Sequence, residues 1–173
     1  RMSEQVPGRE VAEMLQRWFS DVSDLVTSFG GEVDKYIGDC VMVLWRGALQ
    51  TAEEQAVLAA RASVSILKLT EGLSNSAEWP HRDNFPWRCR ISLNTGEALL
   101  GTLGGSGSRD FTVLGDTVNV AFRLNDIAGT MSESILISAE TAKLIKDSFK
   151  VESLGNTPVE GRKETVDIFR VVP

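Results

Sequence analysis

Apolar residues recur at helical spacing in the first long segment of the chain. Between residues 11 and 29 they fall at Val11, Met14, Leu15, Trp18, Phe19, Val22, Leu25, Val26 and Phe29. This spacing predicts an amphipathic helix over residues 11–29, ended by Gly30 and Gly31. A second helix is predicted over residues 51–73, where Thr51 and Glu54 form a capping box.

Two strands are predicted between these helices, over residues 32–37 and 40–45. The second strand, Cys-Val-Met-Val-Leu-Trp, is apolar throughout, a pattern typical of a strand covered on both faces. Gly38 and Asp39 separate the two strands. They predict a tight hairpin with a carboxylate at its tip.

Short strands and helices alternate in the rest of the chain. Strands are predicted over residues 87–93, 97–103, 111–114 and 134–137 and in the tail at 150–172. Helices are predicted over residues 117–128, ended by Gly129, and 139–149, and the glycine-rich stretch 104–108 is expected to be a mobile loop. This order of elements predicts an α+β or α/β sandwich in which helices cover a sheet.

Composition narrows the class of protein. A chain of 173 residues predicts one domain with a sizeable core, and 42% hydrophobic with 24% charged residues is ordinary for a soluble protein. The net charge of −6 argues against a nucleic-acid partner, which requires a surplus of Lys and Arg. No apolar run is long enough for a membrane span. Two cysteines and one histidine argue against a disulfide scaffold and a structural zinc site, and favour a reducing cytoplasm.

Three segments carry residue types suited to chemistry. Asp34-Lys-Tyr-Ile-Gly-Asp39 places a lysine and an aspartate four residues apart around the predicted hairpin. In Phe111-Thr-Val-Leu-Gly-Asp-Thr-Val-Asn-Val-Ala-Phe-Arg123, an asparagine and an arginine four residues apart share one helix face. Arg90-Ile-Ser-Leu-Asn-Thr-Gly96 is a strand that presents an arginine and ends in a tight turn. Taken alone, the first segment is also explained by a polar turn and the second by a solvated helix face.

Together these segments resemble the catalytic domain of the class III nucleotidyl cyclases, which make cyclic AMP or cyclic GMP from a nucleoside triphosphate. The matching motifs are the Lys-x-x-Gly-Asp hairpin, the turn and strand from Asn94 to Gly101, and the run from Thr112 to Arg123. The resemblance covers residues 1–173. It implies the class III cyclase catalytic fold, an α+β, ferredoxin-like α/β sandwich with a βαββαβ core and extra strands.

The resemblance implies a role for each matching residue. Asp39 corresponds to the second of two carboxylates that bind two divalent cations, Mg²⁺ or Mn²⁺. Lys35 corresponds to the purine reader that donates to adenine N1, and Thr112 to its partner in base recognition. Asn119 corresponds to the residue that orients the ribose, and Arg123 to the one that stabilises charge developing on the phosphates.

Two further cations match contacts to the triphosphate. Arg90 corresponds to a phosphate-side arginine on the protomer that carries the metal ligands. Arg162 lies where the family has a basic triphosphate contact, and Lys163 is the alternative in that register.

The reaction implied is conversion of ATP to 3′,5′-cyclic AMP and pyrophosphate by a two-metal mechanism. Lys35 favours adenine because adenine N1 accepts a hydrogen bond, whereas guanine N1–H donates one. A threonine at position 112 is similar to the bacterial branch linked to bicarbonate stimulation. In the family the purine reader and the helix residues face the metal carboxylates of a second protomer. The resemblance therefore implies a head-to-tail homodimer with shared sites, in a cytoplasmic segment of a protein that has a sensor domain elsewhere.

One family motif has no counterpart in this sequence. The family begins with a strand ending in Asp-Ile-x-Gly-Phe-Thr, whose aspartate is the first metal ligand, and this chain opens at Arg1-Met-Ser-Glu. We expect that strand and its aspartate to be missing from residues 1–173, which alone should lack cyclase activity. Asp116 is expected to be the N-cap of the following helix and not a replacement ligand.

Three alternatives stay open. A degenerate or regulatory cyclase-like module, which binds nucleotide or only dimerises, is supported by the missing carboxylate. A guanylate cyclase is opposed by Lys35. A diguanylate cyclase is suggested by Gly30-Gly-Glu-Val-Asp34, but the motifs downstream do not fit that family.

Overall fold

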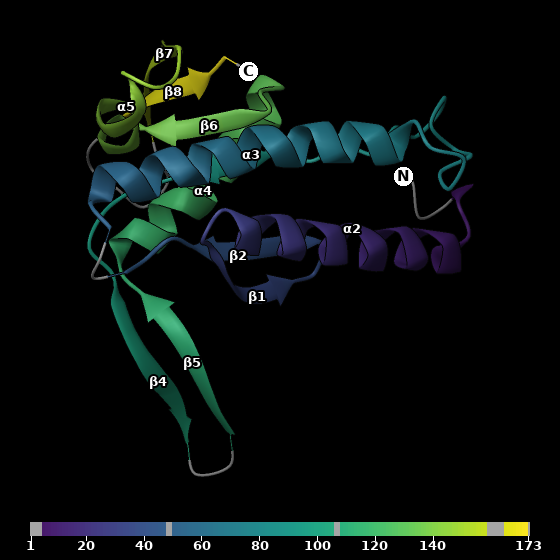
Figure 1. Cartoon of the computed structure of the whole chain (residues 1–173), viewed down its shortest axis with the longest axis horizontal. Helices are drawn as coiled ribbons and strands as arrows, with labels where there is room; N and C mark the ends of the chain where they lie inside the picture. Colours follow the sequence, from purple (N-terminus) through teal and green to yellow (C-terminus); the bar gives the residue numbers. More distant parts are fainter. Residues whose placement is uncertain (1–4, 48–49, 106–107, 159–164, 173) are drawn as a thin grey trace. The chain divides into compact units, whose positions relative to one another are not determined.

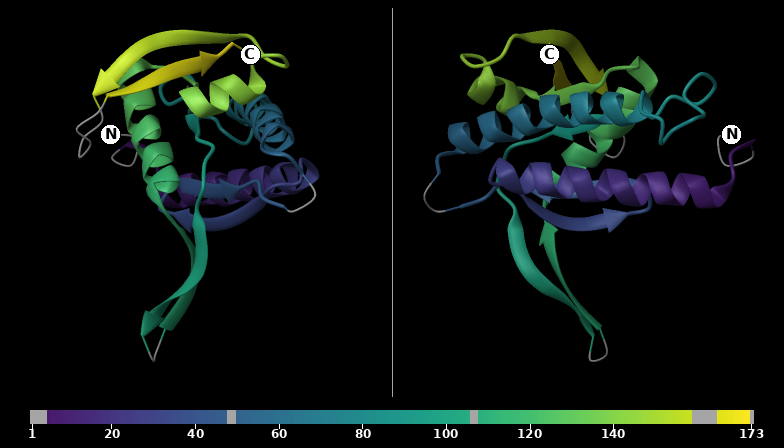
Figure 2. Two further views of the ribbon diagram at one scale, coloured as in Figure 1. Left: turned by 90° about the vertical axis from the view of Figure 1, so that its left-hand side faces the viewer. Right: turned by 45° about the vertical axis from the view of Figure 1, so that its right-hand side comes forward.

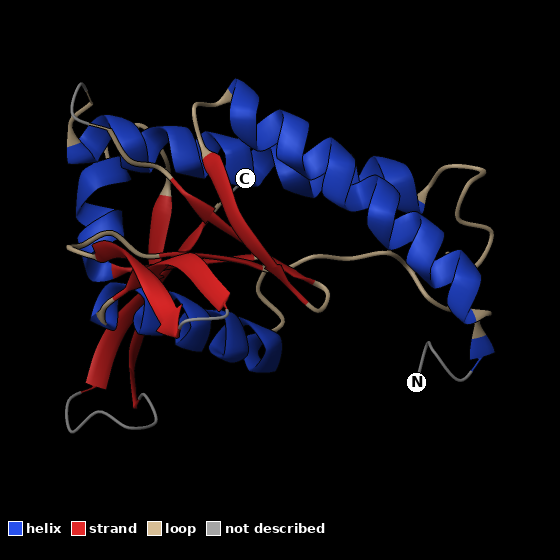
Figure 3. Cartoon of the chain, turned by 90° about the horizontal axis from the view of Figure 1, so that it is seen from below, coloured by secondary structure: helices blue, strands red, loops and turns tan. Residues whose placement is uncertain are grey.

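The structure, a computed structural model, describes residues 5–47, 50–105, 108–158 and 165–172. It divides into two compact units, each described by itself. Unit 1 comprises Arg1–Ala48 and Leu58–Cys89, and unit 2 comprises Leu49–Val57 and Arg90–Pro173. Figure 1 labels the elements, and Figure 3 distinguishes the helices from the strands by colour.

Helix α2 (Gly8–Ser28) confirms the first predicted helix and its apolar face. Its buried residues stand four positions apart, which places them in one stripe along the helix; they are Met14, Trp18, Val22 and Val26. The chain leaves the helix through Gly30, whose φ of 73° a side chain would disfavour.

Helix α3 (Ala52–Ser74) confirms the second predicted helix, and its capping box has formed. The Glu54 N–H donates to Thr51 Oγ1 at 3.1 Å, and the Thr51 N–H donates to the Glu54 carboxylate at 2.7 Å. Within α3, the residues up to Val57 belong to unit 2, and the residues from Leu58 to the end of the helix belong to unit 1. No helix in the described part of the chain is long and apolar enough to cross a bilayer.

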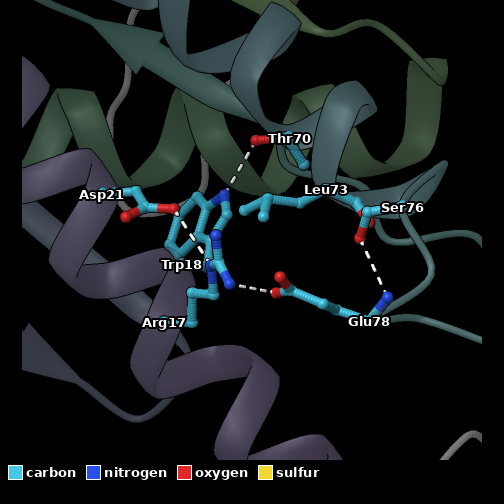
Figure 4. A network of polar contacts seen from close by, with 7 residues as sticks. All are labelled: Arg17, Trp18, Asp21, Thr70, Leu73, Ser76 and Glu78. Atoms are coloured by element: carbon cyan, nitrogen blue, oxygen red, sulfur yellow. Dashed lines mark hydrogen bonds and ion pairs between the residues drawn. The ribbon is translucent and has the colours of Figure 1, made fainter.

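Polar contacts join α2 to the end of α3 and the loop behind it (Figure 4). The Trp18 indole N–H donates to Thr70 Oγ1 at 2.8 Å, and both residues are buried. Arg17 forms ion pairs with Asp21, at 3.6 Å, and with Glu78. The buried hydrogen bond satisfies two polar groups that would otherwise destabilise unit 1.

The predicted strand over residues 87–93 is wrong in its first half. The Trp87 N–H donates to Ser74 Oγ at 2.9 Å, and its ring packs edge-on against Trp79 with centroids 5.1 Å apart. These contacts hold residues 87–89 in unit 1 without strand pairing, and strand β3 (Ile91–Leu93) begins only in unit 2.

Strands β1 (Glu32–Ile37) and β2 (Cys40–Leu44) pair antiparallel in unit 1 and confirm the predicted hairpin. The residues of β2 are half-buried, so the expectation of a strand covered on both faces is wrong. Among the described strands β2 pairs with β1 alone, which explains its partial exposure. After β2, the Trp45 indole donates to the Phe29 carbonyl at 3.0 Å and its ring packs on Gly31.

Unit 2 contains a four-stranded sheet in the order β3-β6-β8-β7. Figure 1 labels β6, β7 and β8, and Figure 2 gives two further views. Strand β6 (Ile135–Ser138) is parallel to β3 and antiparallel to β8 (Thr165–Val171), which pairs antiparallel with β7 (Val151–Pro158). Helix α4 (Asp116–Met131) buries Val120 and Leu124 against Ile168 of β8. Helix α5 (Ala139–Ile145) is shorter than predicted.

A second hairpin in unit 2 joins β4 (Leu99–Gly105) to β5 (Ser108–Leu114). The expectation of a loop over residues 104–108 is wrong for Gly104, Gly105 and Ser108, which lie in the paired strands. Gly105 pairs with Ser108 in the antiparallel ladder of β4 and β5.

Helix α4 differs from its prediction at both ends. Gly115, with φ 143°, takes the N-cap position, so Asp116 is the first helical residue and not the predicted cap. The helix continues past Gly129 to Met131, and Ser132, whose φ is 59°, is its C-cap. Gly129 therefore does not terminate the helix.

Candidate functional site

The β1–β2 hairpin carries two predicted site residues. Asp39 is exposed at the tip, as predicted, and Gly38 supplies a φ of 62° that the tight turn requires. Lys35 lies on β1 opposite Met42, with 32% of its side chain exposed. Its Nζ is 3.3 Å from Oδ2 of Asp34, so the lysine forms an ion pair with its neighbour in the chain.

Helix α4 carries two more predicted residues. Asn119 is exposed and Arg123 is half-buried. They are four positions apart in the sequence, so they stand about one turn apart beside the buried stripe that contains Val120 and Leu124. The helix can therefore present an amide and a guanidinium together.

Three hydrogen bonds fix the first turns of α4 in unit 2. Ser92 of β3 donates to the carbonyl of Ala121 at 2.7 Å, and Asn94 Nδ2 donates to the carbonyl of Thr117 at 2.8 Å. Thr117 Oγ1 in turn donates to the carbonyl of Glu97 at 2.6 Å. The turn after β3 is thus bonded directly to the helix that carries Asn119 and Arg123.

Gly96 allows this close approach. A Cβ at this position would stand 2.7 Å from Thr117 Oγ1, closer than such atoms come in proteins. The Asn-Thr-Gly motif was identified in the sequence as a turn, but its bonds to α4 were not predicted. A polar side chain at the end of a strand has many possible partners, and only the tertiary structure selects one.

Arg90 and Thr112 occupy other places in unit 2. Arg90 is exposed, and a Cβ built on Gly129 would lie 3.3 Å from its Cζ, so the arginine packs across the second half of α4. Arg123 and Gly129 are six residues apart, about 9 Å along a helix axis.

Thr112 is half-buried on β5 and pairs with Gly101. Arg162 and its alternative Lys163 lie outside the described residues.

Asp39 is the predicted metal ligand, and it can fill one ligand position. Carboxylate oxygens are the ligands that Mg²⁺ and Mn²⁺ prefer, and an exposed carboxylate at a turn can approach a cation. The described residues contain no group of three or more His, Cys, Asp or Glu side chains that could hold a metal ion. The described residues therefore fit part of a cation site.

The two cysteines are free thiols. Burial is the main cause that raises the pKa of both Cys40 and Cys89. A raised pKa reduces the thiolate fraction, so neither side chain is an activated nucleophile.

Comparisons with known proteins identify the family of the chain. The model of the family described as "Adenylate and Guanylate cyclase catalytic domain" matches residues 1–171. Adenylate cyclase 1 of Rhizobium meliloti is 29% identical over 163 residues, which cover 94% of this chain and 24% of that protein. The chain therefore spans about a quarter of the length of this curated relative.

Solved structures show the same fold. The adenylyl cyclase CyaB from P. aeruginosa is 30% identical with a TM-score of 0.85, over 99% of this chain and 87% of that chain. The guanylyl cyclase Cya2 is 25% identical with a TM-score of 0.83, over 98% of this chain and 84% of that chain. These similarities confirm the mixed α/β class III cyclase fold. The chain therefore belongs to the family of adenylate and guanylate cyclase catalytic domains, as its three ordered motifs predicted.

Proposed function

We propose that this chain is the catalytic domain of an adenylate cyclase, which converts ATP to 3′,5′-cyclic AMP and pyrophosphate. The observation that carries the proposal is the presentation of Asn119 and Arg123 one turn apart on α4. Hydrogen bonds from Ser92 and Asn94 hold that helix. Catalysis by positioning and electrostatics requires such preorganised groups.

The proposed reaction is an in-line displacement at the α-phosphorus. The ribose 3′-hydroxyl loses its proton to solvent and its oxygen bonds to the α-phosphorus. The bond from the α-phosphorus to the bridging oxygen breaks, and pyrophosphate leaves with the electron pair. Asn119 orients the ribose, and the Arg123 guanidinium stabilises the charge that develops on the phosphates. Arg90 and Arg162 contact the triphosphate as further cations.

Lys35 and Thr112 select adenine in this proposal. The lysine ammonium donates to adenine N1, which is an acceptor, and the threonine hydroxyl can both donate and accept. Guanine has an N1–H donor at the same place, so it would leave a buried donor unpaired against the lysine. Cyclic AMP is therefore the expected product.

Two divalent cations, Mg²⁺ or Mn²⁺, belong to the proposal, with Asp39 as one ligand. When bound, they would activate the 3′-hydroxyl and clamp the attacking and leaving oxygens. Of the family's two metal-binding aspartates, residues 1–173 contain a counterpart of the second only, Asp39, and we propose that the full-length protein supplies the other ligand. That protein acts in the cytoplasm and carries a sensor domain.

The proposed assembly is a head-to-tail homodimer with two shared sites. One protomer supplies Asp39 and Arg90 to a site, and its partner supplies the purine-reading and helix residues. The cyclase domains of this family act as dimers, which supports the assembly.

The test incubates the full-length protein with ATP or GTP and with Mg²⁺ or Mn²⁺, and measures both cyclic products. Cyclic AMP is expected from the full-length protein and is not expected from residues 1–173 alone. Absence of cyclic AMP from the full-length protein would contradict the proposed activity. Robust synthesis by residues 1–173 alone would contradict the need for a second metal-binding aspartate outside these residues.

A complementation assay tests the shared sites. Full-length Asp39→Ala and Arg123→Ala proteins are each expected to be inactive. An equal mixture should recover about a quarter of wild-type activity, because half of the dimers are mixed and each has one intact site. No recovery would argue against sites shared between protomers.

A guanylate cyclase is the second candidate, favoured by the similarity to the guanylyl cyclase Cya2. The same assay separates the two functions, because cyclic GMP would then be the main product. Nucleotide binding without either product would instead indicate a degenerate regulatory module.

A further inference from the structure

The strand that carries Lys35 contains one extra residue. Val33 pairs with Val43 and Lys35 pairs with Met42, so Asp34 has no counterpart on β2 and forms a β-bulge. In a regular strand, neighbouring side chains point to opposite faces of the sheet. A bulge breaks this alternation and can turn two successive side chains toward the same region.

The bulge brings a carboxylate to the lysine. Asp34 Oδ2 is 3.3 Å from Lys35 Nζ, although Asp34 immediately precedes Lys35 in the chain. This distance is that of an ion pair, while Oδ2 forms no hydrogen bond to any described residue. The oxygen therefore retains an unused acceptor position beside the ammonium.

The carboxylate is buried much more deeply than the lysine. Only 4% of the Asp34 side chain is exposed, against 32% of the Lys35 side chain. A buried carboxylate is costly unless a cation compensates it, and Lys35 is the cation within reach. The Asp34 carboxylate is therefore enclosed within unit 1, whereas the Lys35 side chain is partly exposed to solvent.

We infer that Asp34 is a positioning residue that holds the Lys35 ammonium in place for the adenine ring and thereby sets the preference for ATP over GTP. This inference rests on the proposed role of Lys35 as the purine reader. An ammonium has three donors and a positive charge, so Lys35 can keep its ion pair with Asp34 while one N–H donates to adenine N1. A free lysine side chain has many rotamers, and an anchored one loses less entropy when the base binds.

The ion pair between Asp34 and Lys35 also disfavours binding of guanine. If the lysine were free to move away, the N1–H of guanine would meet no opposing donor. Held by Asp34, the ammonium stays where guanine needs an acceptor. Removing the carboxylate should therefore weaken ATP binding and relax discrimination against GTP.

The experiment measures kcat and KM for ATP and for GTP in the full-length protein. Asp34→Asn keeps the shape of the side chain and removes its charge. We expect a rise in KM for ATP and a fall in the ATP-to-GTP ratio of kcat/KM, each of about tenfold, the order expected for losing one charge-assisted contact. In a Lys35→Met background, Asp34→Asn should cause no further change in this ratio, because the two residues act as a unit.

Glu32→Gln is the matched control on the same strand. Glu32 pairs with Arg46 at 2.8 Å on the surface, so its replacement should leave the nucleotide ratio unchanged. If Asp34→Asn fails to fold, Asp34→Glu keeps the charge but displaces the carboxylate by one methylene, and it should still lower the ratio. Thermal unfolding identifies which variants are folded.

The outcomes separate the inference from the proposed function. If Lys35→Met leaves the ATP-to-GTP ratio unchanged, purine reading by Lys35 fails. If Lys35→Met changes the ratio while folded Asp34 variants do not, the positioning role alone is overturned. A loss of kcat that is equal for both nucleotides in Asp34→Asn would show a merely structural role and would also overturn it.

Discussion

The β1–β2 hairpin of unit 1 and helix α4 of unit 2 both carry predicted site residues, but they are held in different ways. The hairpin holds Lys35 next to a buried charge, Asp34, and its strands are half-buried. Helix α4 is held by buried apolar side chains that pack on Ile168 and by hydrogen bonds from the turn after β3.

This difference indicates which property of the protein a substitution in each region should change. On the hairpin a local ion pair involves Lys35, the proposed purine-reading residue, so we expect changes there to alter nucleotide selectivity. On α4 packing sets the position of the whole helix, so changes in its buried stripe should alter stability, whereas changes on its exposed side should alter rate.

The largest effect on stability is expected from Leu124→Ala on α4. Leu124 is buried beside Val120 and Ile168, so its truncation leaves a cavity between the helix and β8. The free energy of unfolding should fall by about 2–5 kcal/mol, measured by urea denaturation. Met131→Ala on the same helix is the control, because Met131 is 40% exposed. This substitution should change the free energy of unfolding by no more than about 0.5 kcal/mol. Equal losses in the two variants would show that the buried stripe does not hold the helix.

Arg123→Ala should separate rate from stability on the same helix. The loss of a guanidinium that stabilises the developing charge should lower kcat by about 10²–10³. The thermal midpoint should stay close to that of the wild type, because Arg123 lies outside the buried stripe. Arg9→Ala removes an exposed arginine paired with Glu13 and serves as the control for activity. Wild-type kcat in Arg123→Ala would remove Arg123 from the proposed site.

Gly38→Ala tests the hairpin through its turn. At Gly38 the φ of 62° would place an alanine in the left-handed region of backbone conformation. The free energy of unfolding should therefore fall by about 1–2 kcal/mol. Gly72→Ala is the matched control in unit 1, because that helical glycine has no atom within 4 Å of the added Cβ and no positive φ. It should stabilise the helix by about 0.5–1 kcal/mol. The sign of the change should thus differ between the two glycines, and the same sign in both would contradict the assigned turn geometry.

The smallest effect is expected at the surface of unit 2, away from both regions. Hydrogen bonds from Arg170, at 2.7 and 3.0 Å, are the main cause that lowers the pKa of Glu152. Because the folded-state pKa is depressed, the contribution to stability is complete above the unfolded value and is lost as pH falls through the folded value. In Arg170→Met, the free energy of unfolding should therefore fall less steeply as the pH is lowered below about 4.5, measured by acid unfolding. Lys143→Met, which removes an exposed partner of Glu140, should leave this part of the profile unchanged.

Much of the secondary structure was predictable because it follows from local rules. The apolar stripe of α2, the capping box of α3 and the β1–β2 turn depend on residues within a few positions of one another. The order of three motifs also predicted the family correctly. The roles of the individual site residues remain predictions, because they depend on nucleotide, cations and a second protomer.

The errors came from pairing and packing that the sequence pattern does not reveal. Gly129 matched a helix-ending signal, but it lies within α4 where the side chain of Arg90 crosses it. Trp87 matched a strand pattern, but bonding to Ser74 and packing on Trp79 keep it outside the sheet. The glycines at 104 and 105 matched a loop, yet they complete the ladder of β4 and β5.

The sequence by itself determined the two long helices, the tight hairpin and the family, because short-range spacing and ordered motifs encode them. Only the tertiary structure decided that Ser92 and Asn94 hold α4 and that a bulge turns Asp34 toward Lys35. The physical reason is that a polar or small side chain has many possible partners along a sequence. Its actual partner is selected by strand register and close packing, which arise only when the whole unit folds.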